Sequence, residues 1–154
     1  MLISRSSLHP LTAVVVGACL FIPRTVFAAE PPPTDVVEVD HTKVEAAFAK
    51  GGPLLLNSSY KVQAGRRVAV GPAEIHEQDT DIFYILEGTA TFVTGGTAVE
   101  KKSIGPGEFH AKEITGGTTR HLVKGDVIVI PAGIPHQFTE INGPFLYYVV
   151  KVTK

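Results

Sequence analysis

The sequence predicts an all-β fold, on the strength of its size, its turn-rich composition and its apolar pattern. The chain has 154 residues, 44% of them hydrophobic, which suits one compact domain with its own core. Its 15 glycines and 11 prolines favour a β protein with many turns. From residue 54 onward, short apolar runs alternate with Gly, Pro, Asn and Asp; they are LLLNSSYKVQ, RRVAV, AEIH, DIFYILEG, TATFVT, HLVKGD, VIVIP, HQFTEI and FLYYVVKV. We therefore expect a barrel built from short strands.

The N-terminus has the features of a signal peptide. Arg5 precedes an apolar segment, Leu11 to Ile22, and Val26-Phe27-Ala28 offers small residues at the cleavage positions. We predict cleavage after Ala28, export to the periplasm or the medium, and no membrane span in the processed protein. An uncleaved anchor, a buried helix and lipidation at Cys19 are the alternatives. Cys19 is the only cysteine, so the processed chain would have neither a disulfide nor a thiolate nucleophile.

We expect a linker and one helix before the strands. Residues 29–39 contain three consecutive prolines, which enter neither a helix nor a central strand. Asp40 to Gly51 has a capping residue, apolar positions at helical spacing and a glycine stop. This helix would lie against the outside of the barrel, and a lid is the alternative. Residues 40–154 would form the single folded domain.

Residues 95–120 are the least regular part of the sequence. Gly-Gly pairs and the Gly-Pro-Gly of residues 105–107 predict long hairpin loops between two halves of the barrel. Such loops at a barrel mouth often contact substrate. A solvated insertion without a role is the alternative.

Charge and residue type restrict the partners. The chain has 14 Lys/Arg against 15 Asp/Glu and no basic stripe, which argues against nucleic acid. Glu74 and His76 lie two apart in an extended run, so their side chains leave the same face of a strand. Asp81 opens the next apolar run, and His136 follows a Pro-x-Gly turn. Imidazole and carboxylate groups brought together inside a barrel are typical ligands of first-row transition metals.

Two sequence motifs resemble those of the cupins, a family of small β-barrel proteins. Gly125, Pro131, Gly133 and His136 match the second motif, G-x5-P-x-G-x2-H-x3-N, except that Glu140 stands in the place of Asn.

In the first motif, G-x5-H-x-H-x3,4-E-x6-G, His76 takes the position of the second His and Asp81 that of the Glu, with Gly88 closing the motif. Glu74 replaces the first His, and Val68 replaces the opening Gly. The resemblance covers roughly residues 54–152.

The resemblance implies a double-stranded β-helix, or jelly-roll barrel, with a metal held by Glu74, His76, Asp81 and His136. Two His and one carboxylate with open positions is the ligand set of non-haem Fe(II) oxygenases, so His76, Asp81 and His136 would form that triad. Glu74 would be a fourth ligand or a catalytic base. Fe(II) or Mn(II) suits these ligands best, with Zn and Ni as alternatives. For each ligand, a structural role is the alternative: a surface or ion-paired Glu74, core histidines, and Asp81 capping a loop.

Other residues are candidates for binding or catalysis. Phe83 and Ile85 would supply an apolar floor, while Phe138 and Glu140 would follow His136 inward at period two. Tyr147 and Tyr148 are adjacent, so one of them faces inward; we assign Tyr148 a catalytic role alongside Glu74.

The remaining polar candidates have a solvated alternative. His110 and His121 would be acid–base groups at the mouth or exposed side chains. Arg66 and Arg67 would attract an anionic substrate or end a solvated strand.

Three functions of different classes follow. The first is a metal-dependent enzyme of oxygenase, isomerase, lyase or decarboxylase type acting on a small organic molecule. The second is a non-catalytic barrel that binds a small molecule or a metal. The third is a structural module that forms a homodimer through its strand edges. We favour the enzyme.

Overall fold

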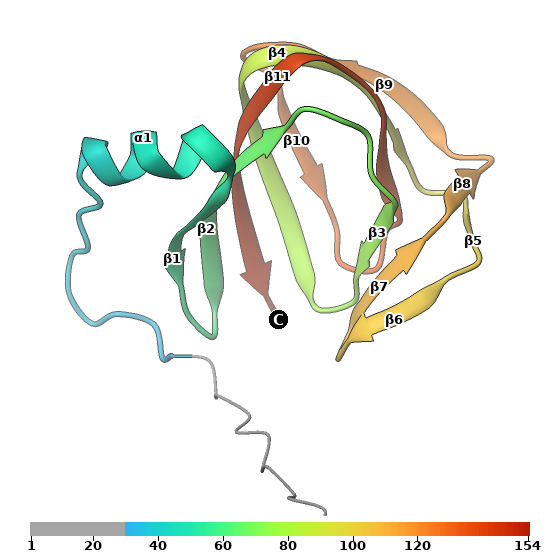
Figure 1. Ribbon diagram of the computed structural model, residues 1–154. Coiled ribbons are helices and arrows are strands. Elements are labelled where there is room, and N and C mark those ends of the chain that lie inside the picture. Colours follow the sequence, from blue (N-terminus) through green and yellow to red (C-terminus); the bar gives the residue numbers. More distant parts are fainter. Residues whose placement is uncertain (1–29) are drawn as a thin grey trace, which may run out of the picture.

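The fold is a barrel of antiparallel strands with one helix outside it, as a computed structural model shows for residues 30–154 (Figure 1). The helix is α1 (His41–Lys50). The strands are β1 (Gly52–Leu56), β2 (Tyr60–Arg67), β3 (Ala73–His76), β4 (Asp79–Thr94), β5 (Thr97–Val99), β6 (Lys102–Gly105), β7 (Glu108–Ala111), β8 (Glu113–Thr115), β9 (Thr118–Leu122), β10 (Val127–Ile130) and β11 (His136–Thr153). The expected all-β class with one short N-terminal helix is confirmed. The predicted signal peptide, residues 1–28, lies outside the described residues.

Helix α1 begins and ends as its sequence predicts. The Asp40 side chain accepts hydrogen bonds from the backbone of Thr42 and Lys43, which are free donors of the first turn. Gly51 ends the helix with a φ of 79°. Phe48 packs its ring edge-on against Tyr148 of β11, with 5.0 Å between ring centroids. The helix therefore lies on the outer face of the sheet, as Figure 1 shows. Within residues 30–154, no helix is long and apolar enough to cross a bilayer.

The two longest strands hold the barrel together. β11 pairs with β4 along almost its whole length, and with β2 along its C-terminal half and β3 at His136. β4 also pairs with β9 and β10, and β3 pairs with β7, which continues to β6. β5 and β8 form a separate two-stranded sheet at the side of the barrel (Figure 1).

Alternating side chains of β4 and β11 fill the barrel. Asp81, Phe83 and Ile85 are buried, whereas Tyr84 between them is exposed. Rings from both strands pack closely; the centroids of Phe92 and Phe138 lie 4.5 Å apart. The apolar floor expected from Phe83 and Ile85 is confirmed.

The prediction of long irregular loops over residues 95–120 is wrong, because this segment forms β5 to β9. The glycines make tight turns rather than open loops: Gly95, Gly96, Gly107 and Gly116 all have φ between 70° and 73°. The strands between them span only a few residues each, which is too short to show a period of two in the sequence.

The expectation that Glu140 points inward is also wrong. The pairing of β11 with β4 shifts by one residue between Phe138 and Glu140, because a bulge interrupts the alternation there. Glu140 is exposed and accepts a hydrogen bond from the Thr91 hydroxyl at 2.8 Å.

Candidate metal centre

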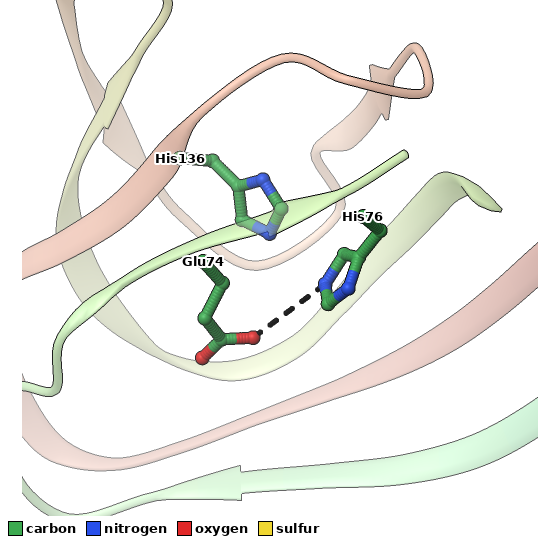
Figure 2. Close-up of side chains that lie close together, drawn as sticks. All are labelled: Glu74, His76 and His136. Atoms are coloured by element: carbon green, nitrogen blue, oxygen red, sulfur yellow. Dashed lines mark ion pairs between the residues drawn. The ribbon is translucent and has the colours of Figure 1, made fainter. Parts of the chain in front are cut away.

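Strand pairing brings the predicted ligands to one end of the barrel interior. β3 carries Glu74 and His76, and His136 opens β11 directly opposite Glu74. One ligand atom from each of these three residues lies within 4.8 Å of the others. Figure 2 shows the Glu74 carboxylate and the two imidazoles turned toward a common point. This separation is suited to three ligands around one ion.

Asp81 lies beside the three candidate ligands and forms an ion pair with Lys151. Its Oδ2 is 3.6 Å from Nε2 of His76 and 3.9 Å from Nε2 of His136. The same oxygen accepts a hydrogen bond from Lys151 Nζ at 2.6 Å. Asp81 can therefore join a metal as a fourth ligand by sharing its carboxylate with Lys151, and its other oxygen, Oδ1, is buried without a hydrogen-bond partner in the described chain.

Each imidazole is oriented through its Nδ1 atom. Nδ1 of His76 is 2.5 Å from Oε2 of Glu108, a residue of β7. Nδ1 of His136 is 3.1 Å from the carbonyl oxygen of Ile134. Because both partners are acceptors, Nδ1 carries the proton in each neutral ring, and Nε2 is left with its lone pair toward the centre.

The buried atoms at the centre fit a metal. Nε2 of His76 is buried and has no hydrogen-bond partner within residues 30–154, as is true of Asp81 Oδ1. A buried polar atom without a partner is costly unless a ligand or water satisfies it. Two imidazole nitrogens and a carboxylate are suitable donors for a divalent transition metal.

The protonation of these groups depends on their neighbours. Burial disfavours the ionised form of Glu74. The interactions of its carboxylate with His76 and with the guanidinium of Arg67 have the larger effect and hold the pKa of Glu74 well below its usual value. Burial also opposes a charged His76, yet Glu74, Asp81 and Glu108 together raise its pKa. Glu74 is thus ionised at neutral pH.

His136 and Tyr147 are governed by burial itself. Burial lowers the pKa of His136, against the opposing effects of the Ile134 carbonyl and Asp81, so its ring is neutral and able to ligate. Burial raises the pKa of Tyr147 despite the nearby charge of Arg67. The Tyr147 hydroxyl therefore keeps its proton.

A cavity of about 140 Å³ adjoins the candidate ligands. Its walls are formed by Phe83, Phe138 and Val149 on the apolar side and by Gln63, Arg67, Glu74, Asp81, His136, Tyr147 and Lys151 on the polar side. Another hollow lies between α1 and the outside of the barrel, beside Phe48 and Leu146. The inner cavity reaches the imidazole of His136 and the carboxylates of Glu74 and Asp81.

Comparison with known proteins decides the family. The family model described as "Cupin" matches residues 27–154. The chain is a cupin. No curated protein matches it.

Solved structures share the fold of this cupin. BH2720 from Bacillus halodurans has 15% sequence identity and a TM-score of 0.55, with 83% of this chain and 87% of that chain covered. The cupin domain of Cnp3 from Schizosaccharomyces pombe has 15% identity and a TM-score of 0.51, with 68% of this chain and 64% of that chain covered. At such identities the likeness establishes the fold.

The assignment of Tyr148 as a catalytic residue of this cupin is wrong. Tyr148 packs against Phe48 of α1 on the outer face, so its side chain does not line the cavity. Tyr147 faces inward instead, and its hydroxyl accepts a hydrogen bond from Arg67 Nε at 3.1 Å. The sequence indicates that one of the pair faces inward; counting in twos from Phe145 or Val149 selects Tyr147.

Sequence reasoning missed two charged residues of the site, Glu108 and Lys151. Lys151 follows Tyr147 and Val149 at period two, so the alternation of β11 was a signal for it. Glu108 had no such signal, because its position depends on the pairing of β7 with β3. Arg67, proposed as an attractant for anions, lies in the cavity and donates to Glu74. His121 is exposed.

Proposed function

We propose that this cupin is an exported metal-dependent enzyme that acts on a small organic molecule. One observation carries the proposal: the Nε2 atoms of His76 and His136 are turned toward the same point as the Glu74 carboxylate, within 4.8 Å. A bound divalent metal acts as a Lewis acid that polarises an oxygen of the substrate. Fe(II) or Mn(II) suits the mixed imidazole and carboxylate ligands best, with Zn or Ni as alternatives.

The residues of the chain have separate tasks in this proposal. Glu74, His76 and His136 hold the metal, and Asp81 is the fourth ligand. Glu74 also pairs with Arg67, which keeps its carboxylate ionised and available as a metal ligand.

The cavity walls complete the site. Phe83 and Phe138 exclude water from it, and the Tyr147 hydroxyl donates a hydrogen bond to an oxygen of the substrate. These functions suit reactions of the oxygenase, isomerase or lyase type.

Metal analysis of the purified protein tests this proposal. We expect near-stoichiometric Fe, Mn, Ni or Zn after purification without chelator or tag, and loss of that metal in His76→Ala and in His136→Ala. His121→Ala is the matched control, because His121 is exposed and distant in sequence from the ligands. Absence of metal even after anaerobic reconstitution would contradict the proposal.

A second candidate is a metal-free barrel that binds a small molecule without reaction. It is favoured by the ion pairs of Lys151 with Asp81 and of Arg67 with Glu74, which already neutralise both carboxylates. In that case a ligand bound to the wild type would be unaffected by added metal and by chelators.

We also propose that residues 1–28 direct export and are removed after Ala28. The support is the charge at Arg5, the apolar segment from Leu11 to Ile22 and the small residues before the cleavage position. Intact-mass measurement of the protein from an exporting host should give the mass of a chain that begins at Ala29. A full-length mass, or a lipid adduct on Cys19, would contradict this proposal.

A further inference from the structure

The cavity contains two cationic side chains, each paired with a carboxylate of the candidate metal site. Lys151 Nζ is 2.6 Å from Asp81 Oδ2, and the Arg67 guanidinium donates to Oε1 of Glu74. Only 13% of the Lys151 side chain and 2% of the Asp81 side chain are exposed. Before a metal binds, the positive and negative charges of these pairs are therefore balanced.

A divalent cation changes that balance. The neutral rings of His76 and His136 bring no negative charge, and the carboxylates of Glu74 and Asp81 are already matched by Arg67 and Lys151. Glu108, whose carboxylate lies against His76, contributes one further negative charge. Binding of a divalent metal would thus leave one uncompensated positive charge in a largely buried cavity. Uncompensated buried charge is costly, so the metal-bound site favours an anion beside it.

Hydrogen-bond donors are available to hold such an anion. The Lys151 ammonium has three N–H groups, one of which is directed to Asp81. The Tyr147 hydroxyl accepts from Arg67 Nε at 3.1 Å, so its own proton is free to be donated into the cavity. Hydrogen bonds from charged or polarised donors to an anion are the strong ones.

The cavity also limits the size of the ligand. At about 140 Å³ it holds the equivalent of roughly four or five water molecules. Pockets for drug-sized ligands measure about 300–1,000 Å³. Phe83 and Phe138 also line the cavity and offer an apolar surface to a short hydrocarbon segment. The geometry fits a carboxylate with a short carbon chain.

We propose that Lys151, Tyr147 and Arg67 form a binding subsite for a short-chain carboxylate substrate next to the metal. This inference rests on the proposed function, since it names the substrate class of the same site. Metal and carboxylate should strengthen each other's binding, because coupling between two sites is reciprocal.

Calorimetric titration and thermal unfolding of the purified protein test the subsite, with and without bound metal. Acetate is the probe, and acetamide is the neutral control of similar shape. Lys151→Met and Tyr147→Phe remove one donor each; the second variant preserves the ring if the first fails to fold. Lys61→Met is the matched control, because Lys61 pairs with Asp79 and does not line the cavity.

We expect acetate, but not acetamide, to bind the metal-loaded wild type more tightly than the metal-free form. Loss of a donor to an anion should weaken acetate binding by about tenfold or more in Lys151→Met and in Tyr147→Phe. Lys61→Met should bind acetate as the wild type does. The same affinity in all of these proteins, or no acetate binding by the metal-loaded wild type, would overturn the subsite.

The metal analysis and the acetate titration distinguish failure of the metal site from failure of the carboxylate subsite. If the protein takes up metal but binds no acetate, the carboxylate subsite fails while the metal site stands. If it takes up no metal, acetate binding that depends on Lys151 supports the subsite in a metal-free barrel. Without metal uptake and without acetate binding, both proposals fail.

Discussion

At the residue scale, Glu108 is the side chain that fixes the direction of the His76 ring. Its Oε2 lies 2.5 Å from Nδ1 of His76, while His76 Nε2 points to the centre of the site. A carboxylate in this position holds the tautomer and makes the ligand more basic. Glu108 thus orients the candidate ligand His76 and is a positioning residue.

Glu108→Ala should weaken metal affinity by about 10- to 100-fold, because the His76 ring loses its orienting partner. Competition with a chelator measures this affinity. Glu108→Gln should recover part of it, since the amide oxygen can still accept from Nδ1. Glu113→Ala, at an exposed position of β8, is the control. Equal affinity in Glu108→Ala and the wild type would show that the contact does not support the metal.

The sequence predicted the candidate ligands at this scale better than their neighbours. Strand alternation directs these side chains inward; Glu74, His76 and His136 converge in the structure, and Asp81 lies beside the two imidazoles. The choice between Tyr147 and Tyr148 required the phase of that alternation. Glu108 could not be found, because nothing local in residues 95–120 indicates which strand will pair with β3.

At the element scale, Gly65 of β2 provides space for the inward-facing Tyr147. The two residues are directly paired, and a Cβ at position 65 would lie 2.5 Å from the Tyr147 ring. Such a distance requires the ring to move. The hydrogen bond between Arg67 and Tyr147 depends on this close approach.

Gly65→Ala should displace the Tyr147 ring toward the cavity and reduce acetate binding by the metal-loaded protein. Metal content should remain, since Gly65 pairs with Tyr147, which is not a candidate ligand. Calorimetry gives the acetate affinity and elemental analysis gives the metal content. Val68→Ala is the control, because Val68 follows β2 at an exposed position. Unchanged acetate affinity in Gly65→Ala would contradict the role given to Tyr147.

Helix α1 depends on the Asp40 cap in a pH-dependent manner. Hydrogen bonds from the Thr42 side chain and the Lys43 backbone lower the pKa of Asp40. A lowered pKa means that the cap contributes fully above the ordinary value of 3.8 and is lost as pH falls through the lowered value.

Asp40→Ala should therefore reduce the amide protection of the first turn at neutral pH, and the difference from the wild type should narrow in acid. Hydrogen exchange corrected for intrinsic rates measures this protection. Asp40→Asn should retain most of it at every pH, because an uncharged amide can still cap. A constant difference between wild type and Asp40→Ala across the acid range would be inconsistent with a cap by the carboxylate.

At the scale of the whole molecule, the aromatic core of β4 and β11 packs against the candidate metal site. Phe92 is fully buried, and its ring lies 5.9 Å from that of His136 between centroids. The sequence predicted this core from the apolar runs. It did not predict that each pair of runs joins into one long strand, since Gly88 and Gly143 resemble ordinary turn residues.

Phe92→Ala should lower the free energy of unfolding by about 3–5 kcal/mol, because it leaves a cavity in the centre of the barrel. Val127→Ala, at an exposed position of β10, should change the free energy by about 0.5 kcal/mol or less. Urea denaturation at equilibrium measures both. Similar values for the two variants would mean that the barrel is not organised around this core.

The central claim is that the barrel holds a metal between His76 and His136. Anomalous diffraction from crystals of the metal-loaded protein tests it most directly. The account predicts an anomalous peak at coordination distance from Nε2 of both imidazoles and from the Glu74 carboxylate. Density for Lys151 alone between Asp81 and the histidines, with no anomalous signal, would contradict it.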